Sequence, residues 1–115
     1  MTKTYPPLSF YINGEFIGIN DRKTQDVINP ATEEVLGRLP YATKEDLDYA
    51  LASAAEAFKS WKHSSPMERS AVLRKAADLA RERADNIAHN LTLDQGKPLA
   101  QALGEVISCA DHCDW

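Results

Sequence analysis

Two cysteines and a histidine near the C-terminus are the residues whose types most directly suggest metal or redox chemistry. Cys109, His112 and Cys113 lie close together in the chain. A structural zinc site needs four ligands, and no second pair of ligands precedes these three. We therefore interpret the cysteines as two buried thiols on one face of a helix, in a reducing compartment. Side chains four residues apart in a helix are poorly aimed for a disulfide.

Neither of these thiols is predicted to act as a catalytic nucleophile. A reactive thiolate needs a cationic partner or a helix N-terminus, and the segment after Lys97 contains no Lys or Arg. The other histidines, His63 and His89, have no acid or serine at a spacing that suggests catalysis. Gly96 and Lys97 are not a phosphate-binding loop, because neither the first glycine nor the final Ser or Thr of that motif is present.

Charge and composition argue against a nucleic-acid-binding, membrane-binding or disordered protein. The 115 residues include 13 Lys and Arg and 17 Asp and Glu, a net charge of −4. This balance gives no electrostatic reason to expect nucleic acid or an anionic membrane as a partner. Apolar residues make up 43% of the chain, enough for a folded domain. No stretch resembles a signal peptide or a membrane span, so we expect a cytoplasmic protein.

The segment 9–40 is predicted to form two short β-hairpins. Asn13-Gly14 lies between β-prone residues, the strongest short signal for a type I′ turn. The runs 24–29 and 35–39 are predicted to pair across the turn that begins at Pro30.

The segment 43–115 is predicted to form three to four amphipathic helices. Thr43 with Asp46, and Ser65 with Glu68, have the spacing of capping boxes. A bend or break is expected near 84–86, with Asp85 capping the new segment. Gly96 is expected to end that segment and Pro98 to open the next. The fold class is therefore α+β for the chain taken alone.

The last predicted helix, 98–115, has no terminating signal. It has no final Gly or Asn, carries Asp111 and Asp114 beside free carbonyls, and ends on Trp115, a large ring that needs burial. We expect that this helix is interrupted and that the chain is the front of a longer protein.

Several short motifs follow one another along the chain. They are Tyr-Ile-Asn-Gly-Glu at 11–15, Ile-Asn-Pro-Ala-Thr at 28–32, the helix start at 42–46, Ala57-Phe58 with Trp61, Glu68-Arg69, and Gln-Gly-Lys-Pro at 95–98. Their order is similar to that seen at the N-terminus of NAD(P)-dependent aldehyde dehydrogenases. The chain resembles this family from about Tyr11 onward. The segment 91–98 is most similar to members that oxidise succinate semialdehyde and related short semialdehydes.

This resemblance implies that residues 1–115 are the truncated N-terminal part of an α/β aldehyde dehydrogenase domain. It implies an oxidoreductase that converts an aldehyde to a carboxylic acid with NAD or NADP, as a homo-oligomer. The catalytic Cys and Glu and the cofactor loops of the family lie beyond this sequence, so we assign no catalytic or cofactor-binding residue. The isolated chain is expected to be inactive and to bind no cofactor. The alternative is an inactive chain that serves only for binding or oligomerisation.

The resemblance also implies one candidate metal site. Some members hold a monovalent cation with two main-chain carbonyls and an acid, at positions that are here Val27, Ile28 and Asp94. Hard cations prefer such oxygen ligands. Asp94 is equally explained as a solvated acid at a helix end.

One position departs from the family pattern. Glu33 stands where glycine is usual in the second hairpin. If the turn needs a positive φ there, Glu33 strains it by roughly 1–2 kcal/mol.

Overall fold

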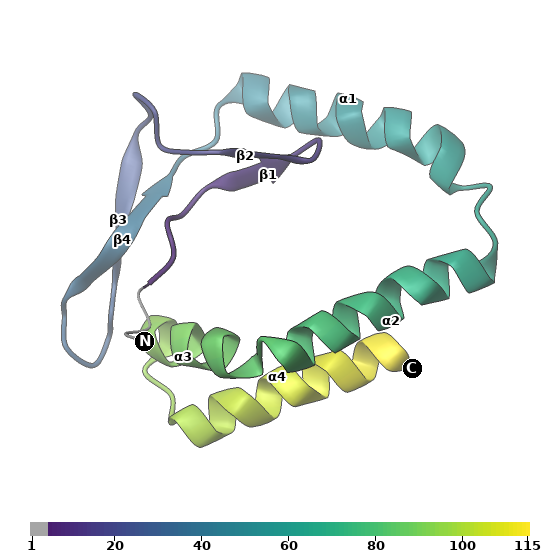
Figure 1. Cartoon of the computed structure of the whole chain (residues 1–115). Helices are drawn as coiled ribbons and strands as arrows, with labels where there is room; N and C mark the ends of the chain where they lie inside the picture. Colours follow the sequence, from purple (N-terminus) through teal and green to yellow (C-terminus); the bar gives the residue numbers. More distant parts are fainter. Residues whose placement is uncertain (1–4) are drawn as a thin grey trace. The chain divides into compact units, whose positions relative to one another are not determined.

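The structure, a computed structural model, describes residues 5–115 and has the predicted α+β order of elements (Figure 1). Residues 1–4, part of the segment in which we find no signal peptide, lie outside the described residues. The strands are β1 (Phe10–Ile12), β2 (Glu15–Ile17), β3 (Thr24–Ile28) and β4 (Val35–Pro40). The helices are α1 (Lys44–Trp61), α2 (Pro66–Glu82), α3 (Ala84–Gln95) and α4 (Leu99–Asp114).

The chain divides into two compact units. The hairpin unit contains Pro6–Val27 and Val35–Ser64, and the three-helix unit contains Tyr5, Ile28–Glu34 and Ser65–Trp115. The first hairpin and α1 therefore belong to one unit, and α2, α3 and α4 belong to the other.

The first hairpin forms as its turn sequence predicts. β1 and β2 are antiparallel, with Tyr11 opposite Phe16. Asn13 and Gly14 have φ values of 52° and 83°, the positive values that a type I′ turn requires. The rings of Tyr11 and Phe16 pack across the strands in a tilted arrangement, with centroids 4.9 Å apart, a distance typical of a stabilising aromatic pair.

The turn between β3 and β4 is organised by Asn29. Its buried side chain accepts a hydrogen bond from the Ala31 amide at 2.9 Å, and its main-chain carbonyl accepts one from the Glu33 amide at 2.8 Å. Glu33 has a φ of 61°, in the left-handed region that favours glycine. The predicted requirement for a positive φ at this position is confirmed.

Replacing Glu33 with Gly is therefore expected to stabilise the turn. Relief of the left-handed strain is partly offset by the greater freedom of glycine in the unfolded chain, which leaves a gain of up to about 1 kcal/mol. Urea denaturation measures the change. Glu34→Gly is the matched control, because Glu34 has an ordinary φ and its side chain accepts a hydrogen bond from Thr32. An equal gain in both variants would contradict the strain at Glu33.

Helix α1 begins with a complete capping box. The Thr43 hydroxyl accepts from the Asp46 amide at 3.2 Å, and the Asp46 carboxylate accepts from the Thr43 amide at 2.7 Å. Ser65 and Glu68 form the same arrangement at the start of α2, with Pro66 in its first turn. Both predicted capping boxes are confirmed. None of the residues of α1 is buried.

The break between α2 and α3 lies at Arg83, one residue before the predicted range. The expectation that Asp85 caps the new helix is wrong. Arg83 occupies the N-cap without a side-chain cap hydrogen bond, and Asp85 lies in the first turn, where its charge still complements the helix dipole.

Small side chains fill the core of the three-helix unit. The cluster consists of Ala84, Ala88, Ala102 and Val106, with Leu91 packed against it. Ala77 and Ala110 are also buried. In α4 the buried residues recur every four positions, at 102, 106 and 110, so they form one stripe. These small residues allow α4 to pack closely on both α2 and α3.

The same stripe explains why the prediction of two buried thiols is wrong. Cys109 is exposed and Cys113 is half-buried. Cys109 directly precedes Ala110 and is rotated from it by about 100° around the helix, which turns its thiol away from the core stripe.

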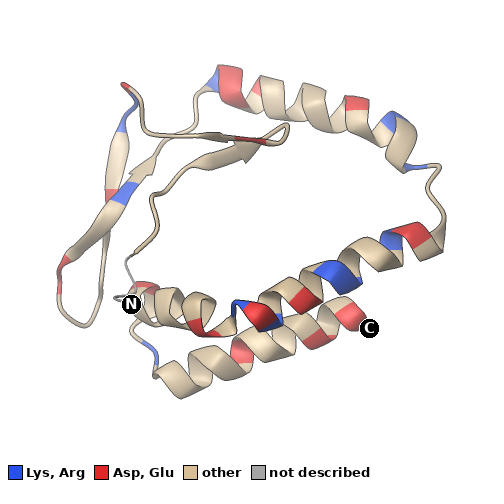
Figure 2. Ribbon diagram, in the orientation of Figure 1, with Lys and Arg blue, Asp and Glu red and all other residues tan. Residues whose placement is uncertain are grey.

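The acidic residues of α4 pair with cations from outside the helix; Figure 2 marks the charged residues on the ribbon. Arg81 of α2 pairs with Asp111 at 2.8 Å and with Asp114 at 2.6 Å. Lys97 pairs with Glu105 at 2.7 Å. The negative C-terminal end of α4 thus receives from α2 the positive charge that its own sequence lacks.

Candidate functional site

The C-terminal end of α3 holds the acid of the predicted cation site. Gly96 ends the helix in the left-handed conformation, with a φ of 69°, and its amide donates to the Thr92 carbonyl at 2.8 Å. Asp94 lies in the last turn, which contains no basic residue. Its carboxylate is therefore at the negative end of the helix dipole, where a hydrogen-bond donor or a cation is favourable.

Tyr5 supplies such a donor. Its hydroxyl donates to Asp94 Oδ1 at 2.6 Å. Burial of Tyr5, together with the hydrogen bond and the charge of Asp94, raises the pKa of Tyr5 to about 12. The hydroxyl thus keeps its proton and donates to Asp94 throughout the physiological pH range.

The turn after β3 meets the same helix end. A Cβ atom placed on Gly96 would lie 3.1 Å from Pro30 Cγ, so the Pro30 ring packs closely on the Gly96 backbone. Ile28, two residues before Pro30, and Asp94, two before Gly96, thus belong to segments in contact within the three-helix unit. Val27 is the last residue of its segment in the hairpin unit. Carbonyl and carboxylate oxygens, the donor types that Ile28 and Asp94 offer, are those that a hard cation prefers.

Gly96 is expected to tolerate substitution poorly. Gly96→Ala should cost about 1–2 kcal/mol for the left-handed backbone alone, and the contact with Pro30 adds to this cost. The free energy of unfolding in urea gives the measurement. Gly104→Ala is the matched control: this position lies within α4, and a Cβ there meets nothing within 4 Å. It should gain roughly 0.5–1 kcal/mol. A loss in Gly104→Ala equal to that in Gly96→Ala would contradict the role of Gly96.

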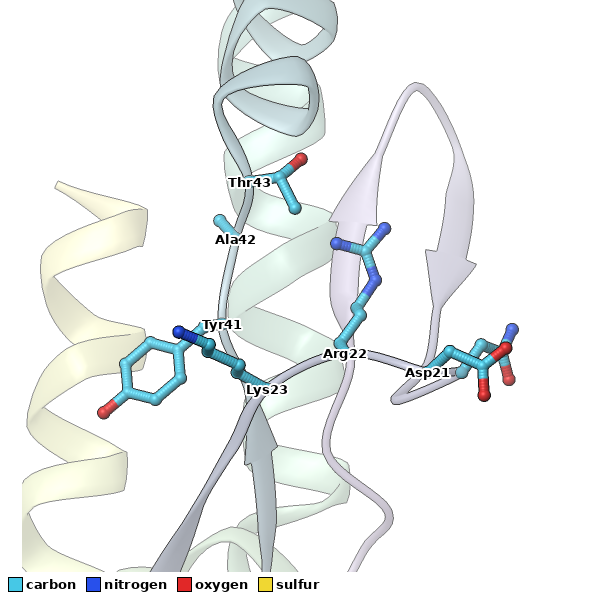
Figure 3. A pocket seen from close by; sticks show the side chains of 7 residues that line it. Asp21, Arg22, Lys23, Tyr41, Ala42 and Thr43 are labelled. Atoms are coloured by element: carbon cyan, nitrogen blue, oxygen red, sulfur yellow. The ribbon is translucent and has the colours of Figure 1, made fainter.

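A separate pocket of about 390 Å³ opens in the hairpin unit, between the loop that precedes β3 and the start of α1. Its lining residues are Asn20, Asp21, Arg22, Lys23, Tyr41, Ala42 and Thr43. Figure 3 shows that Arg22 extends toward Thr43, while Tyr41 and Asp21 project to opposite sides. The Tyr41 hydroxyl donates to Gln25 at 2.6 Å.

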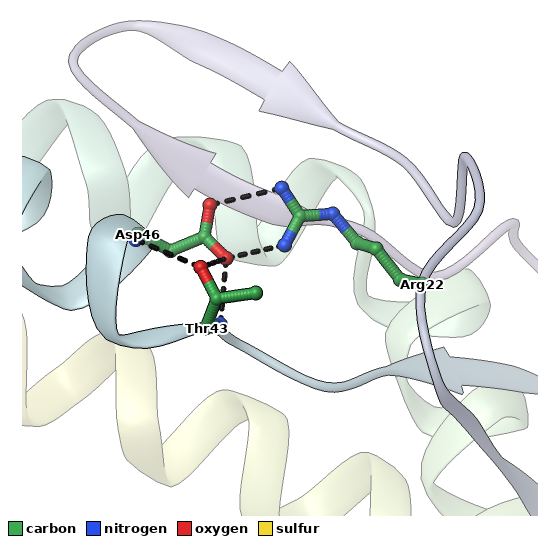
Figure 4. A network of polar contacts seen from close by, with 3 residues as sticks. All are labelled: Arg22, Thr43 and Asp46. Atoms are coloured by element: carbon green, nitrogen blue, oxygen red, sulfur yellow. Dashed lines mark hydrogen bonds and ion pairs between the residues drawn. The ribbon is translucent and has the colours of Figure 1, made fainter.

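The positive charge of Arg22 in this pocket is paired with the carboxylate of Asp46 (Figure 4). Its guanidinium forms a two-pronged ion pair with Asp46, with one contact from Nη2 to Oδ1 at 2.9 Å and a second from Nη1 to Oδ2. The guanidinium also lies 5.4 Å from the centre of the Phe10 ring, in cation–π range. The side chains of Arg22 and Asp46 are only 19% and 12% exposed.

This network changes the acidity of Asp46. The hydrogen bond from Arg22 is the main cause that holds the pKa of the Asp46 carboxyl well below its usual range, and the Thr43 amide adds to it. The network therefore joins the loop at Arg22 to the start of α1. We interpret the pocket as structural and not as a ligand site, because the charges of Arg22 and Asp46 are paired with each other.

The cysteine and histidine cluster does not form a metal site. The His112 Nδ1–H donates to the Ser108 carbonyl at 2.6 Å within α4. Across residues 5–115 no three His, Cys, Asp or Glu side chains are placed to hold a metal ion together. A search of the same residues finds no helix with the length and apolar character to cross a membrane.

Comparison with solved structures identifies the class of protein. The fold matches dehydrogenases that act on aldehydes, among them lactaldehyde dehydrogenase from Escherichia coli, with a TM-score of 0.89, 35% identity, and coverage of 95% of this chain and 23% of that one. An aldehyde dehydrogenase from Brucella melitensis gives a TM-score of 0.88 at 36% identity, with coverage of 100% and 25%.

The sequence places the chain within that class. The profile of the Aldehyde dehydrogenase family matches residues 16–115, and the chain belongs to this family. It is 43% identical over 99 residues to malonate-semialdehyde dehydrogenase of Bacillus subtilis. This match covers 86% of this chain and 20% of the relative. It is 37% identical over 105 residues to an NADP-dependent succinate-semialdehyde dehydrogenase of Schizosaccharomyces pombe, with 91% and 21% covered. The chain thus spans about a fifth of the length of these relatives.

One common dinucleotide-binding motif is missing from this sequence. The five glycines, at 14, 18, 37, 96 and 104, are nowhere spaced as in the Gly-x-Gly-x-x-Gly turn that holds a dinucleotide.

Proposed function

We propose that residues 1–115 are the N-terminal portion of an NAD(P)-dependent aldehyde dehydrogenase that acts on a short semialdehyde. Family members oxidise aldehydes, and the chain spans about a fifth of its relatives. In this proposal the hairpins lie in 9–40 and the helices in 43–115. The complete protein is a cytoplasmic homo-oligomer.

The distribution of apolar side chains is the observation that carries this proposal. Among residues 5–115, the buried hydrophobic residues are alanines and one valine. Large apolar side chains, among them Leu47, Leu51, Phe58 and Trp61 of α1, are instead exposed. A soluble protein seldom leaves so much apolar surface uncovered, so these faces are suited to pack against further protein. In this proposal they support the cofactor-binding domain, and the chemistry lies on residues outside this chain.

The substrate class rests on the relatives. The names of similar proteins include malonate, methylmalonate and succinate semialdehyde. These compounds share an aldehyde and a carboxylate separated by a short carbon chain. We infer the class of short semialdehydes, with succinate semialdehyde as one member, and assign no residue here to its recognition.

An assay of the purified chain tests where the chemistry lies. With NAD or NADP and either malonate or succinate semialdehyde, the 115-residue chain is expected to form no reduced nicotinamide above the blank. An active relative supplies the positive control. Turnover by the chain alone would show that catalytic residues lie within it and would refute the proposal.

A second candidate function is an inactive chain that only binds or oligomerises. The same exposed apolar faces favour it. The coding sequence after Trp115 separates the two: an in-frame continuation with a cofactor turn and a later Cys supports the enzyme, and a stop codon supports the binding segment.

We also propose that Val27, Ile28 and Asp94 contribute ligands to a monovalent cation site. Two carbonyls and one carboxylate suit such an ion, and the helix dipole adds negative potential at Asp94. Water molecules would complete the coordination shell in this chain alone, at positions that further protein groups take in the complete protein.

A further inference from the structure

Tyr5 and Asp94 form a hydrogen bond between residues 89 positions apart in the chain. The distance of 2.6 Å from the hydroxyl oxygen to Asp94 Oδ1 lies in the range of charge-assisted bonds between a hydroxyl and a carboxylate. Such bonds are about twice as strong as neutral ones. Tyr5 is half-buried and belongs to the three-helix unit, as Asp94 does.

The sequence around Tyr5 favours this placement. Pro6 and Pro7 follow directly, and each proline has a fixed φ. A residue before proline is biased toward an extended backbone, which restricts Tyr5 as well. Less conformational entropy is therefore lost when the hydroxyl is held on Asp94. Tyr5 lies outside residues 16–115, so the family match assigns it no role.

The position of Asp94 in α3 makes a hydrogen-bond donor at its carboxylate favourable. A carboxylate in the last turn of α3 faces the negative end of the helix dipole, with no basic residue in that turn. The Tyr5 hydroxyl fixes one oxygen, Oδ1, and leaves the second, Oδ2, for another ligand. An outer hydrogen bond of this kind orients a metal-binding carboxylate and strengthens its binding.

We propose that Tyr5 is a positioning residue that orients the Asp94 carboxylate toward a bound monovalent cation. The inference rests on the cation site proposed above. Tyr5 does not touch the cation itself, and it acts through Asp94.

A potassium titration followed by NMR tests this role in the 115-residue chain with Leu51→Glu and Phe58→Glu, two exposed positions of the hairpin unit whose substitution is expected to keep the chain monomeric. This background is the wild type of the titration. The Gly96 amide is the reporter, because it lies two residues from Asp94 and donates into the last turn of α3. Ionic strength is kept constant with tetramethylammonium chloride, whose cation is too large to be coordinated. The variants are Tyr5→Phe, which removes only the hydroxyl, and Asp94→Asn, which removes the charged ligand. Tyr11→Phe is the control, since Tyr11 is exposed and lies in the hairpin unit.

The wild-type chain and Tyr11→Phe are expected to show the same potassium-dependent shift at Gly96. Tyr5→Phe should bind potassium about tenfold more weakly, and Asp94→Asn should show no specific shift. Equal or tighter binding in Tyr5→Phe would overturn the role of Tyr5 and leave the cation site standing. A wild-type chain without a potassium-specific shift would overturn the cation site and this inference, but not the proposed enzyme family.

Discussion

Replacing Asp46 with Asn is expected to lower the midpoint of thermal unfolding of this chain by several degrees. Asp46 accepts hydrogen bonds from Arg22, from the Thr43 amide and from the Thr43 hydroxyl. The amide of Asn cannot pair with Arg22 as an ion, so the guanidinium is left largely covered and without its counter-charge. Circular dichroism during heating measures the loss.

Asp48→Asn is the matched control for this change. Asp48 pairs with Lys44 at 2.6 Å, but both side chains are mostly exposed. Exposed pairs of this kind contribute little to stability. The control should therefore melt close to the wild-type chain. Equal losses in the two variants would contradict a special role for the Arg22 and Asp46 pair.

The pH dependence of this network has a defined sign. The pKa of Asp46 is lower in the folded chain than in the unfolded chain, where an Asp titrates near pH 3.9. The stabilisation is therefore complete above that pH and is lost as the pH falls toward the folded value. The difference in melting midpoint between wild type and Asp46→Asn should shrink below about pH 4. A difference that stays constant with pH would contradict the lowered pKa.

The purified chain is expected to self-associate at micromolar concentration and to bind a hydrophobic dye. Leu51 and Phe58 of α1 are each 60% exposed and lie on one apolar stripe of a helix with no buried residue. Covering side chains of this size is worth about 1.5–3 kcal/mol each, so several together drive association. Sedimentation velocity and dye fluorescence measure the two effects.

Charged substitutions identify the surface responsible. Leu51→Glu with Phe58→Glu should return the chain toward a monomer and reduce dye binding, because both residues lie on the stripe. Ala52→Glu places a charge off this stripe, about 100° around α1 from Leu51, and should leave association unchanged. A wild-type chain that is monomeric, melts cooperatively and binds no dye would contradict the need for a covering partner.

Local signals in the sequence predicted most of the fold. The turn at Asn13-Gly14, the caps at Thr43 and Ser65, and the helix end at Gly96 each depend on residues within about one turn of one another. Asp85 was the exception among the caps, because α3 begins directly after Arg83 and Asp85 lies within its first turn.

The partners at the candidate sites were not predictable in the same way. Arg22 and Asp46 are 24 positions apart, and Tyr5 and Asp94 are 89 apart. No periodicity or capping rule links such pairs, since they meet only after the elements between them have folded. Cys109 shows a related limit, because a difference of one residue in helical phase separates a buried from an exposed position.

A chimeric enzyme tests most directly whether this chain is the supporting N-terminal portion of an aldehyde dehydrogenase. In the B. subtilis malonate-semialdehyde dehydrogenase, the residues that align with this chain are replaced by the chain itself. The chimera is expected to oxidise malonate semialdehyde at a rate within about tenfold of its parent, a loss of about 1.4 kcal/mol in transition-state stabilisation. The Leu51→Glu and Phe58→Glu substitutions in the chimera should abolish this activity. A chimera that is soluble and folded but inactive, beside an active one built from the matching residues of the S. pombe relative, would contradict the account.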